Sequence, residues 1–356
     1  SYMYSVNMEQ HQGGPADSVY EKRFDVDEHY VSEMRDRAMV LADDPLRCQS
    51  LPHMTLAGWD LLELIMVSKS EDYPELFELN QNGENWHWIN KPLGIDDRFV
   101  FMDDTTLPYG PMEYITRQTQ GDFCVLDQRE ENLWMDAGIV TTQADWSLDF
   151  DIGMNFFEWH APVPLAHEKG IFKRALKFLL NIQQGAPARR LNWTMTVNPL
   201  LDTSPENYHK WGVQKMSLTP QNLAEKQYLR VELQTFFRLP RSNALVFPIR
   251  CYLMSFKDIV SKPKWGRRSA TTFFAWWRRE RRDGRDRGSS SWRHALPEVR
   301  RFAKACRRTR ARQALAAVLR GRLDHARQVR SPSSGAKCVF SSVARSRVSK
   351  RASRSC

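Results

Sequence analysis

The sequence has little cysteine and lacks a long apolar run. Its 6 cysteines among 356 residues are widely spaced, and none stands in a CxxC pair, which excludes the common zinc and redox-disulfide patterns. We expect free thiols in a reducing compartment. The apolar segment Leu61–Val67 is interrupted by Glu63 and is far shorter than the roughly 20 residues that cross a bilayer. The sequence therefore predicts no transmembrane segment.

Targeting signals and nucleotide fingerprints are also missing. No charged stretch followed by an apolar block stands at the N-terminus, so no secretory signal is visible, and we expect a cytoplasmic protein. The chain begins at Ser1 and not at Met, which leaves a preceding segment with an N-terminal anchor as an open alternative. The sequence has no internal repeat and no glycine-rich dinucleotide fingerprint.

The charge is divided unevenly along the chain. The formal net charge is +10, but residues 269–356 hold 24 Lys and Arg against 5 Asp and Glu (+19), while residues 1–268 hold 28 against 37 (−9). The tail has 21 Arg and only 3 Lys. A shifted reading frame or an unspliced intron in a GC-rich gene would produce such an arginine-rich sequence. We expect a disordered tail. The alternative is a genuine basic tail that binds nucleic acid or acidic membrane. The acidic main segment argues against specific nucleic-acid binding.

The segment before the tail has the pattern of an α+β domain. Period-two alternation of β-branched and aromatic residues predicts five strands, at Asp122–Asp127, Leu133–Thr141, Arg190–Val197, Tyr228–Leu239 and Ala244–Met254. Apolar residues at helical spacing predict helices at Asp27–Leu41, with Tyr30, Met34, Ala38 and Leu41 on one side, and at Leu56–Ser68 and His167–Ile182. The Asn- and Gly-rich stretch around Trp86, His87 and Trp88 is assigned no element. We expect a flexible lead-in at residues 1–22, a mainly antiparallel sheet with flanking helices at residues 23–268, and the tail at residues 269–356.

A histidine ahead of two prolines is the strongest candidate for cofactor binding. His160 lies in Glu158-Trp-His-Ala-Pro-Val-Pro164, just before the predicted helix His167–Ile182. Proline fixes φ and with it the local backbone path, which would hold the imidazole in one orientation. That arrangement suits an axial haem ligand. A histidine that is hydrogen-bonded within a loop is the alternative.

The predicted hairpin Tyr228–Met254, which turns at Leu239–Asn243, carries a row of polar residues. Alternation places Arg230, Glu232, Gln234 and Arg238 on one face. If the turn centres near Arg241, Glu232 lies opposite Arg250 in a cross-strand charge pair. This face would also carry Phe236, Val246 and Tyr252. It is then either a solvated face or the wall of a partly apolar pocket with a few placed charges.

Two arginines stand at the entrance of another predicted strand. Arg189 and Arg190 precede Leu-Asn-Trp-Thr-Met195, and their guanidinium groups could pair with carboxylates such as haem propionates. A surface charge pair is the alternative. Trp193 is expected in the core.

These segments, in their order along the chain, resemble the domain of haem-dependent oxidative N-demethylase alpha subunits and their fungal relatives. The resemblance covers roughly Tyr20 to Arg268. It rests on Tyr73-Pro74, Gln120-Gly-Asp122, Ala144-Asp-Trp-Ser147, His160-Ala-Pro-Val-Pro164, Asn192-Trp193, and Leu229-Arg-Val-Glu-Leu-Gln-Thr235 continuing to Arg238-Leu-Pro240. The chain departs from the family at Leu233, where the family has a charged residue, and after Lys264–Arg268, where the resemblance stops.

The resemblance implies a PAS-like haem-binding fold and the oxygen-dependent removal of a methyl group from a small secondary amine, which gives formaldehyde. Electrons would come from NADPH through a partner reductase that carries flavin and an iron–sulfur centre. His160 would be the proximal iron ligand, with His167 as the next candidate. The further site residues would be Arg189, Arg190 and Arg250 for haem, and Glu232, Gln234 and Arg238 for catalysis. A haem-binding sensor without turnover is the alternative, since fold does not fix function.

Overall fold

The computed structural model describes residues 8–11, 20–163, 170–219 and 222–266, with Lys215 and Met216 described for their backbone alone. All of these residues fall within one unit of the chain, Ser1–Arg300, and the second unit, Arg301–Cys356, lies outside them. The described residues end at residue 266, so the predicted tail at residues 269–356 also lies outside them.

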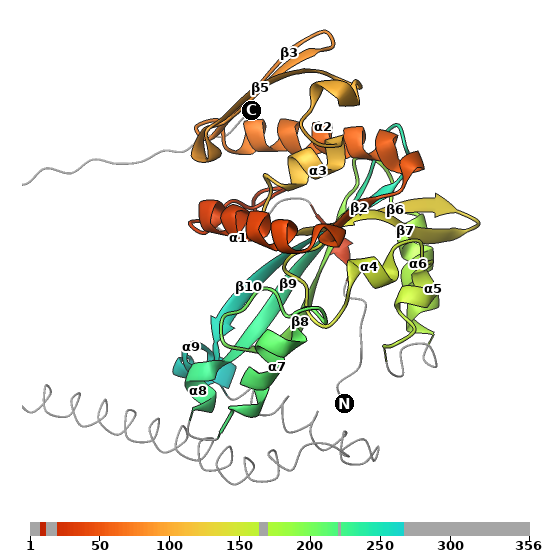
Figure 1. Ribbon diagram of the computed structural model, residues 1–356. Coiled ribbons are helices and arrows are strands. Elements are labelled where there is room, and N and C mark those ends of the chain that lie inside the picture. The colour runs from red at the N-terminus through yellow and green to blue at the C-terminus, as the bar shows by residue number, and fades with distance from the viewer. Residues whose placement is uncertain (1–7, 12–19, 164–169, 220–221, 267–356) are drawn as a thin grey trace, which may run out of the picture. The chain divides into compact units, whose positions relative to one another are not determined.

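The described part of the chain combines helices with antiparallel sheet, as predicted (Figure 1). The larger sheet has the order β1-β8-β9-β10-β6-β7-β2. Its strands are β1 (Glu9–Gln10), β2 (Cys48–Ser50), β6 (Asp122–Arg129), β7 (Asn132–Ile139), β8 (Ala188–Val197), β9 (Gln227–Arg238) and β10 (Leu245–Ser255). The five predicted strands correspond to β6 to β10 and are confirmed within two residues at each end.

The helices pack on both faces of this sheet. They are α1 (Tyr30–Asp43), α2 (Thr55–Asp72), α3 (Pro111–Thr116), α4 (Leu148–Asp151), α5 (Phe156–Trp159), α6 (Ile171–Leu180), α7 (Tyr208–Met216), α8 (Leu223–Lys226) and α9 (Phe256–Ser261). Residues of α1, α2 and α3 share one core with Phe123, Phe237 and Val246. Residues of α4, α5 and α6 share a second core with Cys124, Phe236 and Ile249. Because neighbouring strand residues point to opposite faces, the two cores lie on the two sides of the sheet.

Helix α1 confirms the first predicted helix but not its whole apolar stripe. Tyr30, Met34 and Leu41 are buried, whereas Ala38 is exposed and Arg37 is buried in its place. The prediction was wrong at this position because the buried stripe continues from Met34 by three residues instead of four, and both steps are allowed on one helix face. An arginine at a core position indicates buried hydrogen-bond acceptors.

Helix α2 confirms the second predicted helix and is buried along most of its length. A helix that is apolar on nearly all sides lies inside a domain. Gly58 lets α3 approach closely, because a Cβ at this position would lie 3.1 Å from the Met112 backbone nitrogen. Helix α6 confirms the third predicted helix over its described part, while the predicted start at His167 lies outside the described residues.

The second sheet was not predicted from the sequence pattern. Strands β3 (Phe77–Asn82), β4 (Asn85–Asn90) and β5 (Ile95–Val100) form a three-stranded antiparallel sheet. Trp86 and Trp88 point to its buried face, and Trp88 stacks on Phe77 at 5.7 Å between ring centroids. Asn80, Asn82 and Asn85 lie on the solvent side of β3 and β4, and because asparagine is rare in strands, they hid the alternation.

Candidate functional site

His160 lies at the C-terminal end of the short helix α5, whose N-terminus is capped by side chains. Asn155 and Glu158 form a capping box at the N-terminus of α5, and such a cap fixes where a helix begins. His160 follows at the C-terminus, and its Nδ1 lies 2.8 Å from the backbone oxygen of Phe156. A carbonyl oxygen can only accept, so Nδ1 carries the hydrogen, and in the neutral imidazole the lone pair is then on Nε2. This is the tautomer of metal-binding histidines whose Nδ1–H is held by the backbone.

Aromatic rings surround the half-buried imidazole. The centroids of Phe156 and Phe172 lie 4.4 Å from that of His160, and the centroid of Trp159 lies at 5.5 Å. The predicted rigid turn is described only as far as Val163, so Pro164 and His167 lie outside the described residues. Aromatic packing together with the Phe156 carbonyl limits the orientations that the imidazole can adopt.

The polar row on β9 is buried and interconnected. Arg230, Glu232 and Gln234 are each less than a tenth exposed. Arg230 Nε donates to Glu232 Oε1 at 3.3 Å, and Gln234 Nε2 donates to Glu232 Oε2 at 2.9 Å. The alternative of a solvated face is therefore wrong. We call these three residues the ladder, and the side of the sheet that carries them the ladder face.

His160 and the ladder lie on the same side of the sheet. Phe156, whose carbonyl holds His160, belongs to the same core as Phe236, which follows Gln234 by two residues on β9. Ile249 and Cys251 of β10 join this core as well. A partly apolar surface with a few fixed polar groups is the composition of a small-molecule site.

The hairpin register differs by one residue from the prediction. Glu232 pairs with Cys251, and Arg250 pairs with Leu233. A one-residue slip moves every side chain of a strand to the other face, so Phe236 is on the ladder face as predicted, but Val246 and Tyr252 are not. The pair predicted between Glu232 and Arg250 is therefore wrong. The sequence of the turn did not determine whether its centre lies at Arg241 or half a residue further.

Arg250 belongs to an ion-pair cluster on the opposite face. Its Nη2 lies 2.5 Å from Asp27 Oδ2, and its Nη1 lies 3.0 Å from Glu33 Oε2. Tyr252, also on this face, donates its hydroxyl to Asp25 at 2.9 Å. Arg250 thus joins the segment before α1, and α1 itself, to β10. The structure therefore places Arg250 on the face opposite the ladder and does not bring it together with the other predicted site residues there.

The two arginines of β8 point to opposite sides of the sheet. Arg189 lies opposite Glu9 on β1, and its Nε donates to Glu9 at 2.8 Å. Arg190 lies opposite Gln234 on the ladder face. Its Nε is buried and has no hydrogen-bond partner among the described residues. Burial lowers the pKa of Arg190, and Glu232 opposes that shift. Trp193 is 42% exposed, so its predicted place in the core is wrong.

Arg238 lies at the far end of β9 from the ladder. Its guanidinium donates to the backbone oxygens of Ile182, Asn243 and Leu179 at 3.0, 2.8 and 2.9 Å. An arginine that satisfies the last carbonyls of a helix stabilises the helix end. Six residues of strand, about 20 Å at 3.4 Å per residue, separate it from Glu232. The structure therefore does not bring Arg238 together with the other predicted catalytic residues.

Sequence reasoning missed Asn192, which lies directly opposite Glu232 on β8. Its Nδ2 donates to Glu232 Oε2 at 3.1 Å. Alternation already placed Asn192 on the same side of its strand as Arg190. Only the pairing of β8 with β9 shows which residue it faces.

A model of the family described as haem-dependent oxidative N-demethylase, alpha subunit-like, matches residues 15–296, which is 282 of 356 residues. The chain belongs to this family. The match continues 28 residues past Arg268 (296 − 268), so the predicted end of the resemblance at Arg268 was too early. The change in charge and composition at Ser269 therefore falls inside the matched range.

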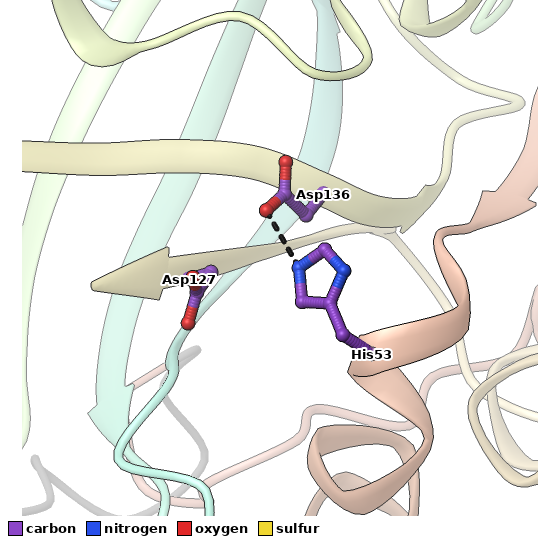
Figure 2. Close-up of side chains that lie close together, drawn as sticks. All are labelled: His53, Asp127 and Asp136. Atoms are coloured by element: carbon purple, nitrogen blue, oxygen red, sulfur yellow. Dashed lines mark hydrogen bonds and ion pairs between the residues drawn. The ribbon is translucent and has the colours of Figure 1, made fainter. Parts of the chain in front are cut away.

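Among the described residues of this family member, one group of side chains has the composition of a metal site. His53, Asp127 and Asp136 bring their ligand atoms within 4.8 Å of one another, and Figure 2 shows His53 directed at Asp136. Asp136 is the extra residue of a β-bulge in β7. Arg129 Nη1 already donates to both carboxylates, at 2.5 Å to Asp127 Oδ2. The cation between these acids is thus an arginine, and the group is an ion-pair cluster.

Two hollows lie away from His160. One of about 450 Å³ is lined by residues of α1, α3, the loop before α3 and the start of β5, including Met34, Tyr109 and Tyr114. The other, of about 410 Å³, lies at the end of the three-stranded sheet beside Asn82 and His87. No helix in the described part of the chain is long and apolar enough to span a membrane.

Proposed function

We propose that this chain is a haem protein that carries out oxidative N-demethylation of a small amine, with His160 as the proximal iron ligand. The observation that carries the proposal is the hydrogen bond between His160 Nδ1 and the Phe156 carbonyl. In the neutral imidazole it selects the tautomer in which Nε2 bears the lone pair that an iron ion needs. Membership of the haem-dependent family gives this geometry its interpretation.

The residues on the ladder face fit a haem in two respects. Aromatic rings beside His160 provide the apolar contact that a porphyrin requires, and the buried Nε of Arg190 has no hydrogen-bond partner within the described part of the chain. A buried donor without a partner costs about 1–3 kcal/mol, and a propionate carboxylate would relieve that cost. We therefore assign propionate binding to Arg190 alone, since Arg189 and Arg250 lie on the opposite face.

The order of the five long strands supports a PAS-like description. Numbered from β6 to β10 along the chain, they stand in the sheet as 2-1-5-4-3, with α4, α5 and α6 between the second and third. This is the arrangement expected of a PAS-like sheet. His160 then lies in the helical segment that covers one face of the sheet.

Glu232 is the residue proposed to hold the substrate. A protonated amine is a cation with N–H donors, and a carboxylate on a mostly apolar wall binds it by a charge-assisted hydrogen bond. Gln234 holds Glu232 from the side. Haem, when bound, would supply the oxidising chemistry by which dioxygen is reduced and the methyl group leaves as formaldehyde. The electrons would come from NADPH through a partner reductase that carries flavin.

Replacing Glu232 tests the amine role. Glu232→Gln keeps the shape of the side chain and removes its charge. The affinity for dimethylamine, read from the spectral shift that it causes, should therefore fall about tenfold, while haem binding changes little. Glu33→Gln is the matched control, because Glu33 also pairs with an arginine but on the opposite face. An equal amine response in Glu232→Gln and parent would return Glu232 to a structural role.

Turnover separates this function from the alternative of a sensor. With dimethylamine, dioxygen and a reductant, the haem-loaded protein should release formaldehyde continuously. Haem binding with reversible ligand uptake, but without formaldehyde, would favour the sensor.

A further inference from the structure

The carboxylate of Glu232 is held asymmetrically. Oε2 accepts two hydrogen bonds, from Asn192 Nδ2 at 3.1 Å and from Gln234 Nε2 at 2.9 Å. Oε1 accepts one, from Arg230 Nε at 3.3 Å. A carboxylate offers about four acceptor positions, two on each oxygen. Among the residues that the structure describes, these contacts therefore fill Oε2 and leave one acceptor position on Oε1.

Arg230 is a rigid anchor for this arrangement. Its side chain is fully buried, and its Nη1 donates to the Leu201 backbone oxygen at 2.7 Å. Its Nη2 donates to the Thr142 backbone oxygen and lies 2.9 Å from Cys251 Sγ. With its donors engaged on two loops and a neighbouring strand, the guanidinium cannot follow Glu232 if the carboxylate turns. The contact to Oε1 thus defines one orientation of Glu232.

We propose that Asn192 is a positioning residue for Glu232. It keeps Oε2 turned toward β8 and so presents the open acceptor position of Oε1 to a cationic amine. Asn192 is suited to this role because it lies directly opposite Glu232 across the two strands and is itself only half-buried. The inference rests on the proposed function for the identity of the ligand, but the contact between the two side chains does not.

The test is a double-mutant cycle read by the dimethylamine-induced spectral shift of the haem-loaded protein. Asn192→Ala removes a hydrogen bond to a charged group, so it should weaken the binding of dimethylamine about tenfold. In a Glu232→Gln background the same replacement should cost nothing further, because Asn192 acts through the carboxylate. Leu191→Ala is the matched control, since Leu191 is the preceding residue of β8, points to the opposite face and is 42% exposed. An equal loss from Asn192→Ala in both backgrounds would overturn the proposal.

A second measurement separates this inference from the proposed function. If Glu232→Gln leaves dimethylamine binding unchanged, the proposed amine-binding role of Glu232 fails. The pair Asn192 and Glu232 is then judged from urea unfolding of the haem-free single and double variants. Non-additive effects would keep Asn192 as the residue that positions Glu232, whereas additive effects would refute it.

Discussion

Replacing Arg37 with alanine should destabilise the protein strongly, because this arginine satisfies several buried acceptors at once. Arg37 is 3% exposed. Its Nε donates to Thr141 Oγ1 at 3.0 Å, and its two Nη atoms donate to the backbone oxygens of Thr116, Thr119 and Gly121. It also lies 3.8 Å from the fully buried carboxylate of Asp122.

The magnitude follows from what the replacement leaves behind. Each buried acceptor without a partner costs about 1–3 kcal/mol, and removing one member of a buried ion pair costs about 3–5 kcal/mol. Water that enters the space would recover part of this, so we expect a loss of about 3–5 kcal/mol. That is a large share of the roughly 5–15 kcal/mol that stabilises a typical protein.

Urea unfolding measured by circular dichroism checks this prediction. Arg35→Ala, on the same helix, is the control, because the ion pair that the structure describes for Arg35 is an exposed one with Asp36 at 3.8 Å, and such pairs contribute about 0–1 kcal/mol. If Arg37→Ala and Arg35→Ala unfold within about 1 kcal/mol of each other, the assignment of Arg37 as a buried hub is refuted.

The Arg37 contacts also extend to the proposed site. Asp122 accepts hydrogen bonds from the backbone nitrogens of Thr141 and Thr142 at 2.8 and 3.0 Å. The oxygen of Thr142 in turn accepts from Arg230, which contacts Glu232. A chain of buried polar contacts therefore joins α1 to the ladder, and loss of Arg37 should also weaken the amine response.

Two further predictions concern stability. Burial raises the pKa of Asp151 from 3.8 to about 6, so the folded state binds this proton more tightly and stability should fall as pH rises from about 4 to about 6, by about 3 kcal/mol. Asp151→Asn should flatten that dependence in urea unfolding at pH 4 and 7, and an unchanged slope would contradict it. Gly121 has φ +88°, and a Cβ there would lie 2.7 Å from the Ile249 oxygen, so Gly121→Ala should cost more than about 3 kcal/mol. Gly83→Ala, with positive φ but open space, should cost only about 1–2 kcal/mol, and equal melting temperatures for the two variants would refute the steric argument.

The elements with regular patterns could be predicted from the sequence. Strands β6 to β10 alternate clearly, and α6 carries a continuous apolar stripe. The sheet of β3, β4 and β5 could not be predicted, because β3 and β4 carry aromatic residues on one face and several asparagines on the other. The place of Arg37 in the core was equally hidden, since only the backbone oxygens of a distant loop explain it.

The candidate site could be predicted in part. His160 and the ladder were chosen from local patterns, and the structure places them on one side of the sheet. Arg250 was assigned to the wrong face because one residue in the hairpin register decides the face of every β10 side chain. Asn192 was missed because its role depends on the pairing of β8 with β9, two strands that lie far apart in the sequence.

The most direct test of the account is haem binding by His160→Gly with and without added imidazole. The parent protein, titrated with haem, should develop a Soret band with one haem per chain. His160→Gly should bind haem weakly, and free imidazole should restore the parent spectrum by occupying the space of the lost ring. An unchanged spectrum in His160→Gly without imidazole would show that another residue holds the iron and would contradict the account.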